Sequence, residues 1–85
     1  MKKIEIYTTK FCPFCVKAKS LLNKKNIKFL EIDVSDDQAL REKMTAMANG
    51  ARSVPQIFAD NVYIGDCDKI YKLDREKKLD KLLGF

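Results

Sequence analysis

Residues 3–15 of the chain read KIEIYTTKFCPFC. Apolar and polar side chains alternate over residues 3–8, and this period of two predicts a β-strand. Pro13 follows soon after, and the first turn of a helix accepts proline because its amides have no partners within the helix. The segment therefore predicts a strand that leads into a helix, with Cys12 and Cys15 at the junction.

The residues that follow extend this segment into a strand–helix–strand unit. Apolar side chains at the spacing of one helical face predict an amphipathic helix that ends near residues 25–26. These side chains are Phe14, Ala18, Leu21 and Leu22. Residues 27–33 (IKFLEID) favour a second strand, and two strands joined through a helix favour a parallel pair with a right-handed crossover.

The rest of the chain predicts two more strands and three more helices. Ser35-Asp36-Asp37-Gln38 has the form of a capping box, and Gly50 suits the end of the helix that this box opens. Residues 56–59 and 62–64 favour a hairpin around a turn at Asp60-Asn61. A third helix opens within residues 65–68, and the leucines at 79, 82 and 83 predict a short last one. The predicted fold class is α/β, with a four-stranded mixed sheet flanked by helices in the order β-α-β-α-β-β-α-α, as a single domain over residues 1–85.

Composition and charge exclude several classes of function. The chain has 85 residues, 17 Lys and Arg against 12 Asp and Glu, and no histidine, so its formal net charge is +5. Without histidine there is no His-based catalytic triad and no imidazole ligand for zinc. The basic excess favours an anionic partner, but the lysines are spread along the chain and mixed with acids, as on a solvated surface. We expect no nucleic-acid or membrane partner, and a cytoplasmic protein because the N-terminus lacks the apolar run of a signal peptide.

Two of the three cysteines form a Cys-x-x-Cys motif. A helix that begins at Pro13 would direct free amides at the sulfur of Cys12 and favour its reactive thiolate form, and Lys10 can add positive charge. Cys15 lies one turn further on and is more shielded, so Cys12 is predicted to attack a disulfide and Cys15 to resolve the product. Zinc is the alternative, but a zinc site needs about four ligands and only Cys67 remains. We therefore expect a redox pair and no metal.

Two further segments each allow two interpretations. The proline of Val54-Pro55 is either a plain strand-edge residue or part of a cis peptide that turns the Val54 backbone toward a peptide-like ligand. Gly65-Asp66-Cys67-Asp68 is either a capped turn or an anion site, in which helix amides bind a carboxylate and Asp68 pairs with an ammonium group. A ligand that offers both charges is the α-amino acid end of a molecule.

Three motifs in this order resemble those of the glutaredoxin family, in its short bacterial dithiol form, and the resemblance extends over the whole chain. They are YTTKFCPFC at 7–15, SVPQIF at 53–58 and GDCD at 65–68. The resemblance implies a thioredoxin-like fold, a cis bond before Pro55, and glutathione as a co-substrate, with no tightly bound cofactor.

The resemblance also implies roles for individual residues. Cys12 and Cys15 would be the redox pair, and Val54 would pair through its backbone with the cysteinyl part of glutathione beside Ser53 and Pro55. Gly65, Cys67 and Asp68 would hold the γ-glutamyl end, and Phe14 would line the groove. The family often has a lysine where this chain has Thr9, so Lys10 and Arg52 are the candidates for the glycyl carboxylate. Asp66 and Lys69 stand where a glycine and an aspartate are usual, and the charge of Asp66 is expected to oppose the bound carboxylate.

The activity implied by the resemblance is that of a monomeric glutathione-dependent oxidoreductase (a thioltransferase) in electron transport and cell redox homeostasis. It would reduce protein disulfides through Cys12 and Cys15, and glutathionylated proteins through Cys12 alone. Glutathione reductase would act indirectly, by regenerating glutathione. The alternatives are a thioredoxin-like donor reduced by a flavoprotein reductase, which has no need of the site at 65–68, and an iron–sulfur cluster carrier, which Pro13 disfavours by stiffening the ligand loop.

Overall fold

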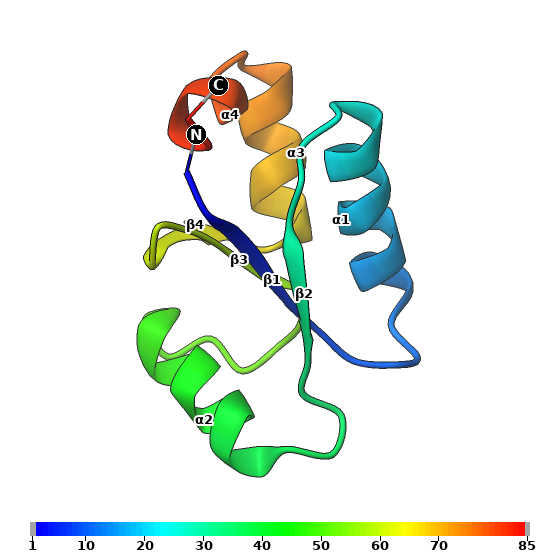
Figure 1. Cartoon of the computed structure of the whole chain (residues 1–85), viewed down its shortest axis with the longest axis vertical. Helices are drawn as coiled ribbons and strands as arrows, with labels where there is room; N and C mark the ends of the chain where they lie inside the picture. Colours follow the sequence, from blue (N-terminus) through cyan, green and yellow to red (C-terminus); the bar gives the residue numbers. More distant parts are fainter. Residues whose placement is uncertain (1, 85) are drawn as a thin grey trace.

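A computed structural model describes residues 2–84 of the chain, and it contains the predicted elements in the predicted order. They are β1 (Ile4–Thr8), α1 (Pro13–Lys24), β2 (Leu30–Asp33), α2 (Gln38–Met47), β3 (Gln56–Ala59), β4 (Val62–Gly65), α3 (Cys67–Arg75) and α4 (Leu79–Leu82). The first and last described residues lie close together beside α4 (Figure 1), where Lys2 Nζ donates to the Leu82 carbonyl at 3.2 Å.

The four strands form one mixed sheet in the order β2-β1-β3-β4, which confirms the predicted fold class. The pairing of β1 with β2 is parallel, and the pairings of β1 with β3 and of β3 with β4 are antiparallel. Tyr7 lies opposite Gln56, so the end of β1 and the start of β3 are at the same edge of the sheet. The loop that carries the cysteines and the loop that carries Pro55 therefore meet there.

Helices cover both faces of the sheet (Figure 1), and each face has its own core. On one face α1, α3 and α4 pack over Ile4, Ile6 and Ile57. On the other face α2 packs over Tyr7 and Phe58, whose rings meet edge to face at a centroid distance of 5.4 Å. Because both faces are covered, all five residues of β1 are buried.

The second strand is shorter than the sequence predicts. It begins at Leu30, whereas the prediction begins at Ile27. Asn26 adopts a left-handed conformation (φ 59°), and the amide of Ile27 then donates to the carbonyl of Leu22. Ile27 therefore closes the end of α1, and its buried side chain belongs to the first core.

The predicted capping box at the start of α2 is wrong in its register. The N-cap is Asp37, whose carboxylate accepts from the amide of Leu40 at 3.0 Å. The hydroxyl of Ser35 accepts instead from the amide of Lys10, at 2.9 Å. The side chain of Ser35, which the local sequence would assign to the cap, thus binds a residue 25 positions away in the chain. At the other end of α2, Gly50 has the positive φ that its position predicts, 93°.

Candidate active site

Cys12 is the N-cap of α1, and its sulfur is held by two backbone groups. The amide of Cys15 donates to Cys12 Sγ at 3.1 Å. The thiol of Cys12 in turn donates to the carbonyl of Val54, at 3.7 Å. Pro13 stands in the first turn of the helix, as predicted. An amide donor and the start of a helix, where backbone amides have no partners within the helix, therefore both face this sulfur.

The two cysteines of the motif differ in access to solvent. Cys12 is partly exposed, whereas Cys15 is 1% exposed and lies inside the first turn. Burial, with the hydrogen bond to Cys12 as the second cause, raises the pKa of the Cys15 thiol to about 12. A disulfide arriving from outside can reach Cys12 and cannot reach Cys15, which is the asymmetry that the predicted roles require.

The Val54–Pro55 peptide bond is cis, so the second interpretation of this dipeptide describes the geometry. Pro55 is buried just before β3, and Val54 directs its carbonyl at Cys12. The backbone at Val54 and the sulfur of Cys12 therefore come from distant parts of the chain and meet in one place.

A groove of about 220 Å³ lies beside these two residues. It is formed where the start of α1, the loop before β3 and the start of α3 come together. The residues that line it are Phe14, Ser53, Val54, Pro55, Asp66, Cys67 and Asp68. Six of these seven were predicted to bind glutathione, and Asp66 is the addition.

The start of α3 is a capped turn. Asp66 is the N-cap, and its carboxylate accepts from the amide of Lys69 at 2.9 Å. The capped-turn interpretation of this segment therefore describes its geometry, and the structure identifies Asp66 as the capping residue. The amides of Cys67 and Asp68 come earlier in the same turn, where a helix has no partners for them within itself.

Gly65 shapes this turn and does not line the groove. Its φ is +149°, and a Cβ at this position would lie 2.4 Å from Cγ of Lys69. Any larger residue would push the start of α3 away from β4, so the glycine is required by a close approach of two elements.

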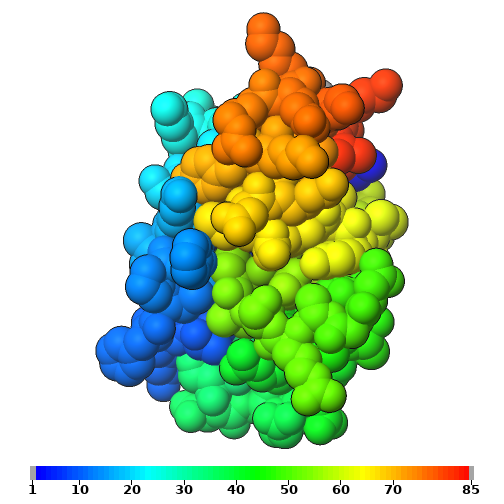
Figure 2. Space-filling model, turned by 180° about the vertical axis from the view of Figure 1, so that it is seen from behind, coloured from blue at the N-terminus to red at the C-terminus, as the bar shows by residue number. Residues whose placement is uncertain are grey.

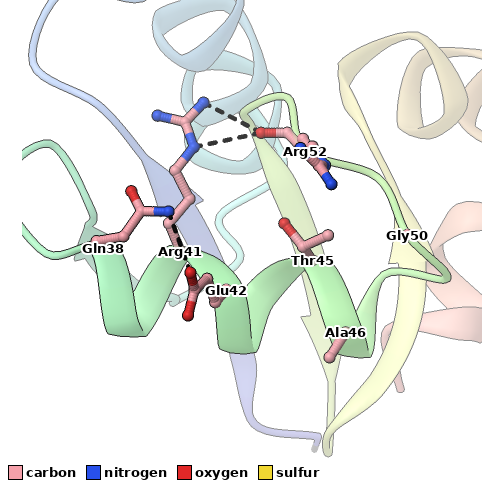
Figure 3. A pocket seen from close by; sticks show the side chains of 7 residues that line it. All are labelled: Gln38, Arg41, Glu42, Thr45, Ala46, Gly50 and Arg52. Carbon is pink, nitrogen blue, oxygen red and sulfur yellow. Dashed lines mark hydrogen bonds between the residues drawn. The ribbon is translucent and has the colours of Figure 1, made fainter.

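Lys10 and Arg52, the candidates for the glycyl carboxylate, are not among the residues that line the groove. The ammonium of Lys10 pairs with Asp36 at 3.3 Å, and Lys10 lines a separate hollow with Phe11 and Arg41. Arg52 lines another cavity, of about 490 Å³, over α2 (Figure 3). No local sequence pattern reveals that Lys10 pairs with Asp36 or that the loop places Arg52 over α2.

Three residues that the sequence analysis missed hold the loop before β3. Buried Gln56 donates to the Ser53 carbonyl at 2.9 Å and accepts from the hydroxyl of Tyr63 at 2.7 Å. Arg41 donates from Nε and Nη2 to the carbonyl of Arg52, at 3.3 and 3.1 Å (Figure 3). A glutamine inside an apolar strand is a signal that could have drawn attention to Gln56, whereas an arginine on an exposed helix gives none.

Cys67 lines the groove but is buried, and this burial raises the pKa of its thiol. It therefore contributes backbone and packing rather than a second nucleophile. Across residues 2–84 no three Cys, Asp or Glu side chains converge as metal ligands would, and no helix in that range has the length and apolar character needed to cross a membrane.

Known proteins match most of the chain in sequence. The family model for glutaredoxin matches residues 4–64. A probable glutaredoxin from Synechocystis is 54% identical over 81 residues, covering 95% of this chain and 92% of its own length. Glutaredoxin 3 of Escherichia coli is 45% identical over 83 residues, covering 98% and 99%.

Solved structures show the same fold. The solution structure of a glutaredoxin from Brucella melitensis superposes with a TM-score of 0.86 at 44% identity, covering 98% of this chain and 89% of that one. A buckwheat glutaredoxin, solved as its glutathione complex, gives a TM-score of 0.86 at 22% identity, covering 96% and 76%.

Proposed function

The chain belongs to the glutaredoxin family, and on this premise we propose that it is a thiol–disulfide oxidoreductase that takes its electrons from glutathione. The observation that carries the proposal is the placement of Cys12. Its sulfur accepts from the Cys15 amide at 3.1 Å and lies 3.7 Å from the carbonyl of Val54, which lines the groove together with Asp68. The proposal includes action as a single-domain monomer in the cytoplasm.

The monothiol route uses Cys12 alone. Its thiolate attacks the glutathione sulfur of a glutathionylated protein, a Cys12–glutathione disulfide forms, and the protein leaves as a thiolate that takes a proton from water. A second glutathione thiolate then attacks the glutathione sulfur on Cys12. Oxidised glutathione leaves, and the thiolate of Cys12 is restored.

The dithiol route adds Cys15. Cys12 attacks a protein disulfide and forms a mixed disulfide, while one protein thiolate leaves. Cys15 gives up its proton, which water carries to the protein thiolate that has already left. Cys15 then attacks the sulfur of Cys12, the Cys12–Cys15 disulfide forms, and the second protein thiolate is released. Burial raises the pKa of Cys15 to about 12, so its thiolate is scarce at neutral pH. The attack therefore relies on the position of Cys15 in the first turn of α1, next to the sulfur of Cys12. Two molecules of glutathione then reduce the disulfide in turn.

The groove supplies the groups that glutathione needs. The backbone of Val54 would pair with the cysteinyl residue, and Asp68 would pair with the γ-glutamyl ammonium. The amides of Cys67 and Asp68 would donate to the neighbouring carboxylate. A relative of the same fold, the buckwheat glutaredoxin, is known as a glutathione complex, which supports this assignment.

A coupled assay tests the proposal. Glutathione, glutathione reductase, NADPH and a small disulfide should give NADPH oxidation that depends on both the protein and glutathione. Turnover that needs no glutathione and instead follows an added thioredoxin reductase would favour the alternative donor function. Visible absorbance in freshly purified protein would favour the iron–sulfur carrier.

A further inference from the structure

Phe11 is the most exposed of the large apolar side chains among residues 2–84. Its side chain is 96% exposed, while Phe58 is fully buried and Phe29 packs against the first core. Phe14, two residues after Cys12, is 58% exposed. A single exposed apolar residue is ordinary, but here two aromatic rings flank the nucleophile on both sides in sequence.

The backbone around Phe11 is anchored, so its exposure does not come from a loose loop. On one side the amide of Lys10 donates to the Ser35 hydroxyl at 2.9 Å. On the other side the carbonyl of Cys12 accepts from the Val16 amide at 3.1 Å in the first turn of α1. Figure 2 shows this segment, in blue, projecting from the edge of the molecule. A ring presented from a fixed backbone loses little entropy when a partner covers it.

The reaction itself brings a partner to this place. In the monothiol route the cysteine of the substrate protein is one disulfide bond from the sulfur that Cys12 attacks. The groove beside Phe14 and Asp68 would be occupied by glutathione, so the substrate chain would pass over residues outside this groove, and Phe11 precedes Cys12 in the sequence without lining the groove. Among these residues Phe11 offers a large and almost fully exposed apolar side chain.

We propose that Phe11 is a docking residue for the protein part of the substrate and that it selects an apolar side chain next to the disulfide cysteine. The inference rests on the function proposed above. An apolar partner is favoured over an acidic one because the two cations that line a hollow with Phe11 are already engaged. Lys10 pairs with Asp36 at 3.3 Å, and Arg41 donates to the Arg52 carbonyl at 3.1 Å. Covering part of a phenyl ring with another apolar group would raise kcat/KM about three- to tenfold.

Two glutathionylated tetrapeptides that differ only in the residue before cysteine, leucine in one and serine in the other, test this proposal. The quantity compared is the ratio of kcat/KM for the leucine peptide to that for the serine peptide. In the unaltered protein this ratio should be about three to ten, and in Phe11→Ser it should fall to about one. A ratio within each variant cancels any general effect on Cys12.

Val16→Ser is the matched control, because Val16 is 63% exposed on α1 but lines no part of the groove. It should keep the ratio of the unaltered protein, and Phe11→Tyr should restore most of it. An unchanged ratio in Phe11→Ser would overturn the docking role while leaving the proposed function intact. If the unaltered protein reduces neither peptide, the proposed function fails, and this inference fails with it.

Discussion

The two ends of α1 differ in how they interact with the rest of the molecule. At its C-terminal end Lys25 forms ion pairs with Asp74 at 2.6 Å and with Asp80 at 3.0 Å, which tie the helix to α3 and to α4. At its N-terminal end a cysteine replaces the usual oxygen cap, and Phe11 and Phe14 face the solvent.

The difference shows which interactions stabilise the fold and which serve chemistry. At the C-terminal end one ammonium bridges two carboxylates, and the pKa of Lys25 is raised by its hydrogen bonds to these aspartates. At the N-terminal end a partly exposed thiol and two exposed aromatic rings are left for molecules that come from outside. Changes at the first end should therefore alter stability, and changes at the second should alter activity.

The largest expected effect is at Cys12. Cys12→Ser should lower both deglutathionylation and protein-disulfide reduction by about 1000-fold or more, because the serine hydroxyl is a poor nucleophile without an adjacent base. Cys15→Ser should keep the first activity and lose the second. Stopped assays with a glutathionylated peptide and with a protein disulfide measure the two routes. Equal loss of deglutathionylation in both variants would contradict the assigned roles.

A pH effect should follow at Cys15. Its pKa in the folded protein, about 12, lies above the unfolded value of 9.0, so the unfolded chain loses its proton first. The stability associated with this thiol is complete below pH 9 and is lost as the pH rises toward 12, by at most about 1.4 kcal/mol per pH unit.

Urea unfolding of the reduced protein at pH 8, 9 and 10 would measure this loss. Cys15→Ala is the comparison, because every other titrating group is the same in both chains. The fall in the free energy of unfolding above pH 9 should be shallower in the variant, and identical slopes would show that Cys15 does not contribute.

The opposite end of the helix should give a smaller change, in stability alone. Lys25→Met should lower the free energy of unfolding by about 1 kcal/mol, since it removes a partly buried cation shared by two carboxylates. Lys24→Met is the control, from an exposed neighbour at the same end. Neither variant should change kcat/KM with a small disulfide, and a loss of activity in Lys25→Met would break the division between the two ends.

The smallest expected effects separate the two aspartates at the start of α3. Asp68→Ala should raise the KM for glutathione about fivefold with little change in stability, because Asp68 is exposed and lines the groove. Asp66→Ala should lower the free energy of unfolding by about 1 kcal/mol, since it removes the cap on the Lys69 amide. Thermal unfolding and glutathione titrations would separate them, and an Asp68→Ala variant with an unaltered KM would refute the ammonium contact.

Sequence reasoning succeeded where the determinants are close together in the chain. The strand and helix that meet at Cys12, the hairpin at Asp60-Asn61, and the order of all eight elements follow from period, proline and turn residues. The motifs also predict that six of the seven residues lining the groove belong to one site.

Sequence reasoning failed where the role of a side chain depends on a contact with a residue far away in the chain. Ser35 was assigned to a helix cap and instead binds the amide of Lys10. The pairing of Lys10 with Asp36, and the hydrogen bonds from Arg41 on α2 to the loop at Arg52, are likewise missing from the sequence-based prediction. Each of these contacts depends on how loops fold back at the edge of the sheet, which no local pattern encodes.

The adjacency of Lys2 and Leu82 has a consequence for how the chain can be rearranged. A short flexible linker could join the two ends, and the chain could be reopened between Asp60 and Asn61, which are both exposed. That cut leaves the Lys3 amide bonded to the Asp60 carboxylate at 2.7 Å and touches neither end of α1. A circular permutant of this design would place the redox motif in the middle of its sequence while retaining the same fold around it.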